Sequence, residues 1–186
     1  MEPAFGLLEL PAGLSWSSPA LWISTWLGTG LVSPFRSGLA VATALPIALL
    51  LRDRASLAWL FAAVTCLGVV GMVLWQEATG SGDDRRIVID EVAGFLLMAT
   101  LLGAARWRRL LMAAPVYLFI DRLKIWPLDQ LEALPNGAGI MADDFGAALL
   151  TILLFLALDR LFPSTSAPRA QGPSLGTAAA DDQPGA

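Results

Sequence analysis

The chain has 186 residues, of which 56% are hydrophobic and only 15% are charged. A soluble domain normally carries about 25% charged residues, so this composition indicates an integral membrane protein. The net charge of −4 argues against a nucleic-acid partner, and the absence of histidine excludes histidine general bases and the usual zinc sites.

The first half of the chain predicts a loose tail or a short surface helix, followed by apolar helices. Residues 1–20 are mixed in character, and residues 21–32 are apolar and tryptophan-rich but too short to cross a bilayer, which favours a helix lying in the interface. Residues 38–51 predict an apolar helix interrupted by Pro46. Residues 56–75 form the clearest span, because about 20 uncharged residues match the hydrocarbon core. Within this span we expect Cys66 to be a small buried hydrophobic side chain rather than a nucleophile.

The second half predicts two further spans, over residues 87–105 and 145–162. Between them lie a short apolar run over residues 110–120 and a polar segment over residues 121–144. From residue 163 onward the composition predicts a disordered tail. We therefore expect an all-α fold, a small multi-pass helical membrane bundle of about four spanning or partly spanning helices. Its domain occupies residues 21–162, between tails at 1–20 and 163–186.

Alternation of the helices across the membrane brings three charged patches to one face. The spans and the short run alternate in direction, so the loops between them fall on two sides, and most acids fall on the same side. These patches are Glu77, Asp83, Asp84, Arg85, Arg86, Asp90 and Glu91; Asp121, Arg122 and Lys124; and Asp143 and Asp144.

Crowded carboxylates repel one another and are costly near hydrocarbon, so these patches need neutralising charge. Neighbouring arginine and lysine side chains supply some of it, and a divalent cation is the other source. A set of oxygen ligands without histidine favours a hard ion such as Mg²⁺, and arginine suits a phosphate. In a helix that begins at residue 87, Gly94 shares a face with Asp90 and Glu91 and leaves room for a ligand or a neighbouring helix.

Simpler interpretations exist for each patch. Asp90 and Glu91 are also what a helix dipole favours in a first turn. One of Asp143 and Asp144 also suits the N-cap of the last helix, and Asp121 also suits an ion pair with Lys124. Three other interpretations complete the set: a solvated turn over residues 84–86, headgroup anchoring by Arg106, Arg108 and Arg109, and an ordinary exposed charge at Asp159.

Three motifs in the second half of the chain resemble those of the phosphatidylglycerophosphatase A family. DDRRIVIDEVAG at residues 83–94 resembles D-x-x-x-I-V-x-D-E-x-x-G. IDRLKIWPL at residues 120–128 resembles F-D-x-x-K-P-x-P-I, with Ile125 in place of a proline. GAGIMADDFGAA at residues 137–148 resembles G-x-G-I-M-x-D-D-x-x-A-G, with Ala148 in place of the last glycine. In a fourth, N-terminal element at residues 33–46, Leu39 and Ala42 stand where hydroxyl residues are expected.

The resemblance implies a Mg²⁺-dependent phosphomonoesterase of the bacterial inner membrane, with its site on the cytoplasmic face. Its substrate would be a membrane phospholipid within the bilayer, phosphatidylglycerophosphate, and its products phosphatidylglycerol and phosphate. On this basis we expect Asp121 to activate water or to attack directly. The remaining expected roles are metal binding by Asp90, Glu91 and Asp144 with Asp83 or Asp143, and phosphate binding by Lys124 with Arg86 or Arg122.

Three rival functions remain open at this point. A transporter or channel also has acids at a membrane face, although it more often shows repeats and broken helices. A non-catalytic relative would retain the fold, and a phosphatase acting on another lipid phosphate would retain the motifs. The sequence identifies no protein partner.

Overall fold

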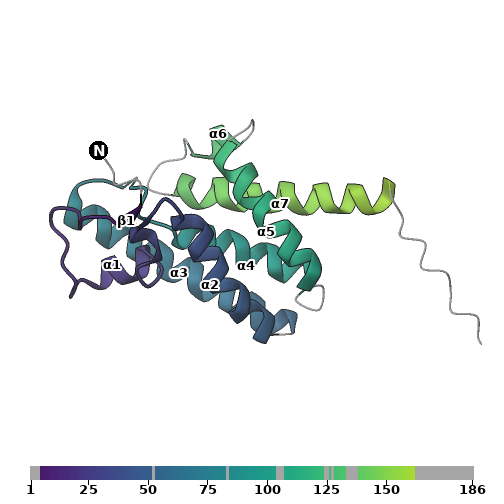
Figure 1. The fold of residues 1–186 in the computed structure, drawn as a ribbon, viewed down its shortest axis with the longest axis horizontal. Coiled ribbons are helices and arrows are strands. Elements are labelled where there is room, and N and C mark those ends of the chain that lie inside the picture. Colours follow the sequence, from purple (N-terminus) through teal and green to yellow (C-terminus); the bar gives the residue numbers. More distant parts are fainter. Residues whose placement is uncertain are drawn as a thin grey trace, which may run out of the picture.

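The computed structural model describes residues 5–51, 53–82, 84–103, 107–123, 126, 128–132 and 138–161. These residues form a bundle of helices, as expected, with one short antiparallel ladder in addition (Figure 1). The elements are β1 (Gly6–Leu7), α1 (Pro19–Ser24), a 3-10 turn (Thr29–Leu31), β2 (Val32–Ser33), α2 (Arg36–Leu50), α3 (Arg54–Thr79), α4 (Ile89–Leu102), α5 (Trp107–Leu123), α6 (Leu128–Glu132) and α7 (Ala138–Leu161).

Two helices, α3 and α7, are long and apolar enough to cross a membrane. Within Arg54–Thr79 and Gly139–Leu161, an 18-residue stretch has a mean hydropathy of 2.3 and 1.9, respectively. At about 1.5 Å per residue, each helix exceeds the roughly 30 Å of a hydrocarbon core. Helix α3 exposes leucine and valine side chains and α7 exposes leucine side chains, as a surface in contact with acyl chains requires. Cys66 lies on the exposed side of α3, so the expectation that it is buried is wrong.

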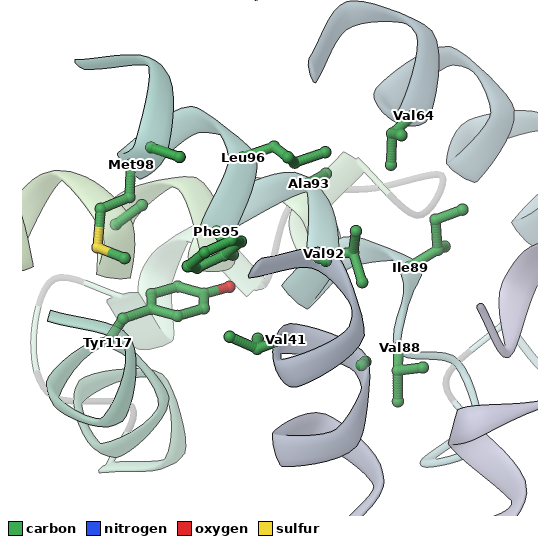
Figure 2. Packing of buried hydrophobic residues seen from close by; sticks show 14 of the residues in the cluster. Val41, Val64, Val88, Ile89, Val92, Ala93, Phe95, Leu96, Met98 and Tyr117 are labelled. Atoms are coloured by element: carbon green, nitrogen blue, oxygen red, sulfur yellow. The ribbon is translucent and has the colours of Figure 1, made fainter. Parts of the chain in front are cut away.

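Helix α4 is the core of the bundle rather than a full span. It has 14 residues, ten of which are buried, and it packs against α2, α3, α5 and α7. A helix of this length covers only about 21 Å, so the span expected over residues 87–105 is too long. Figure 2 shows Phe95 and Met98 of α4 packed near Tyr117 of α5. The apolar run of α4 is therefore covered by protein and not by lipid.

Two prolines lie inside helices without ending them. Helix α2 continues through Pro46, where we expected an interruption, and α5 continues through Pro115. A membrane helix tolerates a proline when neighbouring helices hold the segments on either side of it. As a result, α5 extends from Trp107 to Leu123 and is longer than the apolar run expected at residues 110–120.

The N-terminal segment, residues 5–18, contacts the bundle through Leu8. The Leu8 side chain is buried, and its N–H donates to the Leu31 carbonyl at 2.8 Å. The interfacial helix expected over residues 21–32 is also shorter: α1 has six residues, and positive φ angles at Trp26, Leu27 and Gly28 reverse the chain. Figure 1 shows α1 and β1 together at one end of the bundle.

The last helix begins earlier than the sequence indicated. Helix α7 starts at Ala138 instead of residue 145, and α6 packs against it within the segment expected to be only polar. The close approach of α6 depends on Gly146, where a Cβ atom would lie 2.5 Å from Leu128 Cδ2. The tail expected from residue 163 lies outside the described residues.

Candidate active site

Several helices contribute one end each to a cavity of about 740 Å³. It is formed by the start of α2, the first turn of α4, the end of α5, the first two turns of α7 and the loop before α4. Acids, arginines and a few apolar side chains surround it. The lining residues are Pro34, Phe35, Arg36, Ser37, Gly38, Asp84, Arg85, Ile87, Asp90, Glu91, Leu118, Asp121, Arg122, Ile140, Asp143 and Asp144.

Helix α4 contributes two acids from its first turn, as predicted. Asp90 is buried, and its Oδ1 accepts a hydrogen bond from the Glu91 backbone N–H at 3.0 Å. The Ser37 hydroxyl of α2 donates to Glu91 Oε1 at 2.5 Å. The other oxygen, Glu91 Oε2, is buried and has no hydrogen-bond partner within the described part of the chain. A buried carboxylate oxygen left in this way is costly, and a cation would satisfy it.

Helix α7 contributes Asp143 and Asp144, which are only 5% and 4% exposed. Asp143 Oδ1 accepts from the Asp144 N–H at 3.0 Å, and Asp144 Oδ1 accepts from the Tyr117 hydroxyl at 2.5 Å. Because α7 begins at Ala138, both acids lie inside the helix, and the interpretation of either one as its N-cap is wrong. Both residues therefore line the cavity and do not cap the start of the helix.

Asp121, near the end of α5, completes the acidic lining. Its residue is partly buried, and its charge repels those of Asp90, Glu91 and Asp144. Acids from each of the three patches that the sequence assigned to one face therefore lie within electrostatic range of one another. Such crowding of acids favours a bound cation.

Arginines line the same cavity. Arg36, Arg85 and Arg122 border it, and the charge of Arg36 stabilises the Glu91 carboxylate. Arg86 is not among the lining residues: its Nη1 pairs with Asp84 Oδ2 at 2.7 Å. The partly enclosed pair argues against a fully solvated turn over residues 84–86, because both side chains are mostly covered. The other two expected site residues, Asp83 and Lys124, lie outside the described residues.

Sequence reasoning missed Arg36, Ser37 and Tyr117. The first two lie in the N-terminal element. There Leu39 and Ala42 lack the hydroxyl groups expected at their positions, whereas the neighbouring Ser37 supplies one. One feature of the sequence could have pointed to Tyr117. It is the only tyrosine of the chain, and it lies within an apolar run that contains no other hydroxyl group.

The far end of the bundle carries charges of a different kind. Arg109 Nη2 donates to Asp159 Oδ1 at 2.8 Å, and a second hydrogen bond joins Arg109 Nη1 to Asp159 Oδ2. Asp159 is exposed, as expected, and it is in addition paired with Arg109 of α5. The Arg108 guanidinium lies 5.3 Å from the centre of the Trp107 ring, and Arg106 lies outside the described residues.

The cavity fits a hard cation by the chemistry of its donors, which are carboxylate oxygens without histidine or thiol. Among the described residues, no three acids already stand close enough to hold an ion by themselves. The observation that favours a cation is that Glu91 Oε2 is buried and has no hydrogen-bond partner among the described residues. Binding would then draw the acids of α4 and α7 together and relieve their repulsion.

Two apolar helices long enough to span a membrane, together with a cavity of acids and arginines, are the features expected of a membrane enzyme that acts on a phosphorylated lipid. Residues 22–159 match the family described as Phosphatidylglycerophosphatase A, so the chain belongs to this family and is a phosphoric monoester hydrolase. Phosphatidylglycerophosphatase A of Haemophilus influenzae is 30% identical over 151 residues, an alignment that covers 78% of this chain and 91% of the relative. No solved structure matches the chain.

Proposed function

We propose that the protein hydrolyses the terminal phosphate of phosphatidylglycerophosphate, giving phosphatidylglycerol and inorganic phosphate, with Mg²⁺ as cofactor. The observation that carries this proposal is the convergence of Asp90, Glu91, Asp121 and Asp144 on one cavity bordered by arginines. A transporter would need an acidic path through the membrane, whereas these acids gather at the ends of helices.

Asp90, Glu91 and Asp144 would hold Mg²⁺, with Asp143 or Asp83 as a further ligand. When bound, the ion neutralises the phosphoryl oxygens and makes the phosphorus more electrophilic. Ser37 holds Glu91 Oε1, and the Glu91 N–H holds Asp90 Oδ1. Each carboxylate thus has one oxygen engaged by the protein and presents the other as a ligand.

Arg122 and Lys124 would bind the phosphate, since guanidinium and ammonium groups match its charge and hydrogen-bonding capacity. Arg36 and Arg85 border the same cavity and add to this set. Arg86 is paired with Asp84, so its contact with phosphate would require it to exchange partners. We therefore assign Arg86 a secondary part in phosphate binding.

Asp121 would act as general base or as nucleophile. As a base it takes a proton from water, the water oxygen attacks phosphorus, and the bond from phosphorus to the glycerol oxygen breaks. The glycerol oxygen then takes up a proton and leaves as a hydroxyl group. Phosphoryl transfer depends mainly on positioning and charge neutralisation, which this lining supplies.

The site would lie at the cytoplasmic face of the bacterial inner membrane. The acyl chains would remain in lipid beside α3 and α7, whose outer faces expose apolar side chains, while the headgroup enters the cavity. The substrate then never has to leave the bilayer.

The first test replaces the acids of α4. Asp90→Asn and Glu91→Gln should each lower Mg²⁺-dependent phosphate release from phosphatidylglycerophosphate by roughly a hundredfold or more, because loss of charge removes a ligand. Phosphate release is measured in membranes with and without Mg²⁺. Asp159→Asn is the matched control, since it removes an acid at the far end of the bundle, and it should retain activity. Full activity in both α4 variants would refute the metal assignment.

A second test addresses the substrate. Deletion of the gene should cause phosphatidylglycerophosphate to accumulate in the lipid extract, and the wild-type copy should reverse this. Accumulation of a different lipid phosphate would contradict the proposed substrate while leaving the phosphatase assignment in place.

A further inference from the structure

We infer that Tyr117 is a positioning residue that fixes the Asp144 carboxylate of α7 and joins it to the first turn of α4. The inference rests on the proposed function, because it concerns the cation site to which Asp144 contributes. Three contacts of the Tyr117 hydroxyl oxygen carry it: those to Asp144 Oδ1 and to the Glu91 carbonyl oxygen, and the close approach to Gly94.

The hydroxyl group lies between the two acidic helices. It donates to Asp144 Oδ1 at 2.5 Å and lies 3.1 Å from the Glu91 carbonyl oxygen. Tyr117 belongs to α5, so a single atom of a third helix meets α7 and α4 just where their acids face the cavity. A charge-assisted bond of this length is among the stronger hydrogen bonds in a protein.

The surroundings of Tyr117 leave it little freedom. The residue is fully buried, and Figure 2 shows its ring beside Phe95 and Met98 within the apolar cluster. A buried hydroxyl without a partner is costly, so the packing that holds the ring also keeps the hydroxyl on Asp144.

Gly94 is what admits the hydroxyl to this position. A Cβ atom at Gly94 would lie 2.4 Å from Tyr117 Oη and 3.1 Å from the Asp144 carbonyl oxygen. The first distance is shorter than normal packing allows, and the second is tighter than most Cβ contacts. The glycine of the acidic motif therefore clears space for Tyr117 and for α7, rather than for a ligand.

The consequence is a fixed orientation of Asp144. The terminal torsion of an aspartate is broad, so a carboxylate without a partner samples a range of orientations. With Oδ1 engaged by Tyr117, the second oxygen is the one that Asp144 offers to a cation. A hydrogen-bonding partner of a metal ligand typically contributes about 10- to 100-fold to metal affinity.

The experiment uses the full chain purified in detergent. Tyr117→Phe removes only the hydroxyl, and Gly94→Ala displaces it by a different route. Thr151→Val is the matched control: it removes a buried hydroxyl on α7 that donates to the Ala147 carbonyl at 2.8 Å within its own helix. For each protein, the Mg²⁺ concentration that gives half of the maximal rise in unfolding temperature is measured, together with kcat and KM at saturating Mg²⁺.

We expect Tyr117→Phe and Gly94→Ala to need roughly tenfold or more Mg²⁺ for half of the stabilisation. Their KM should stay near that of the wild type, and Thr151→Val should keep the wild-type Mg²⁺ requirement. A Tyr117→Phe protein with a lower unfolding temperature but an unchanged Mg²⁺ requirement would overturn the inference, because that result describes a purely structural residue. If Tyr117→Phe does not fold, an unchanged requirement in Gly94→Ala would overturn it equally.

Failure of the underlying function looks different. A wild-type protein that gains no stability from Mg²⁺ would contradict the proposed cofactor, and the inference with it. A wild-type protein that responds to Mg²⁺ beside an unaffected Tyr117→Phe variant would overturn the inference alone.

Discussion

At the scale of single residues, the two oxygens of the Glu91 carboxylate differ in their hydrogen bonding. Ser37 donates to one oxygen, and the other is buried without a hydrogen bond in the part of the chain that the structure describes. Leaving a buried polar atom unsatisfied costs about 1–3 kcal/mol, and more when it is charged. The site thus stores an unfavourable interaction that a ligand can relieve.

Replacement of Ser37 tests this account. Ser37→Ala should lower phosphate release about tenfold, since Glu91 then loses its donor and the orientation that the donor imposes. Ser37→Thr retains a hydroxyl and should stay within about threefold of the wild type if the larger side chain fits. The measurement is the initial rate of phosphate release at fixed Mg²⁺. Equal rates for the alanine variant and the wild type would show that Glu91 needs no partner from α2.

At the scale of elements, α3 is joined to its neighbours through glycine. A Cβ atom at Gly71 would lie 2.6 Å from Ile23 Cγ2 and 2.9 Å from Ser24 Oγ of α1. At Gly68 it would lie 2.4 Å from Met141 Cε of α7. Helices in membranes associate closely where small residues let their backbones approach. One side of α3 thus packs on protein, while the other exposes residues such as Cys66 to lipid.

A larger residue at Gly71 should separate α1 from α3. Gly71→Val should destabilise the protein by roughly 1–3 kcal/mol, as overpacking of a tight contact does. Ala63→Val adds two methyl groups to the exposed side of the same helix and should have little effect. Thermal unfolding in detergent compares the two variants. A larger loss for Ala63→Val than for Gly71→Val would mean that the α1 contact contributes little.

At the scale of the whole molecule, the two ends of the bundle differ in chemistry. One end gathers the cavity and its acids, and the other carries the ion pair of Arg109 with Asp159. Helix α3 runs between them, with Ala55 at one end and the turn containing Ser81 just beyond the other. The orientation of α3 therefore fixes which side of the membrane the cavity faces.

Labelling of single cysteines should reveal that orientation. In a Cys66→Ala background, Ser81→Cys should resist a membrane-impermeant maleimide in intact spheroplasts and react after lysis. Ala55→Cys, at the opposite end of α3, should react in both. The amount of label is read on the purified protein. The reverse pattern would place the cavity outside the cytoplasm and would contradict the proposed location.

Some of this organisation could be predicted because it depends on local patterns. The uncharged run of α3 has the length of a span, and Asp90 and Glu91 directly precede an apolar segment, so their place in a first turn followed. The burial of α4 could not be predicted, because an apolar run has the same composition whether lipid or protein covers it. Ser37 and Tyr117 were missed because their roles depend on contacts with residues 54 and 27 positions away.

The enclosure of α4 has a consequence for how the chain enters the membrane. A helix that begins with two acids and is shorter than the bilayer is a poor candidate to partition into lipid by itself. Helix α3, with 26 residues against 14 in α4, is long enough to cross the membrane and precedes α4 in synthesis, so α3 is expected to be in place first and to receive α4 along its glycine-lined side. Biogenesis would then proceed through a pair of helices, and substitutions at Gly68 would reduce the yield of inserted protein before any effect on catalysis appeared.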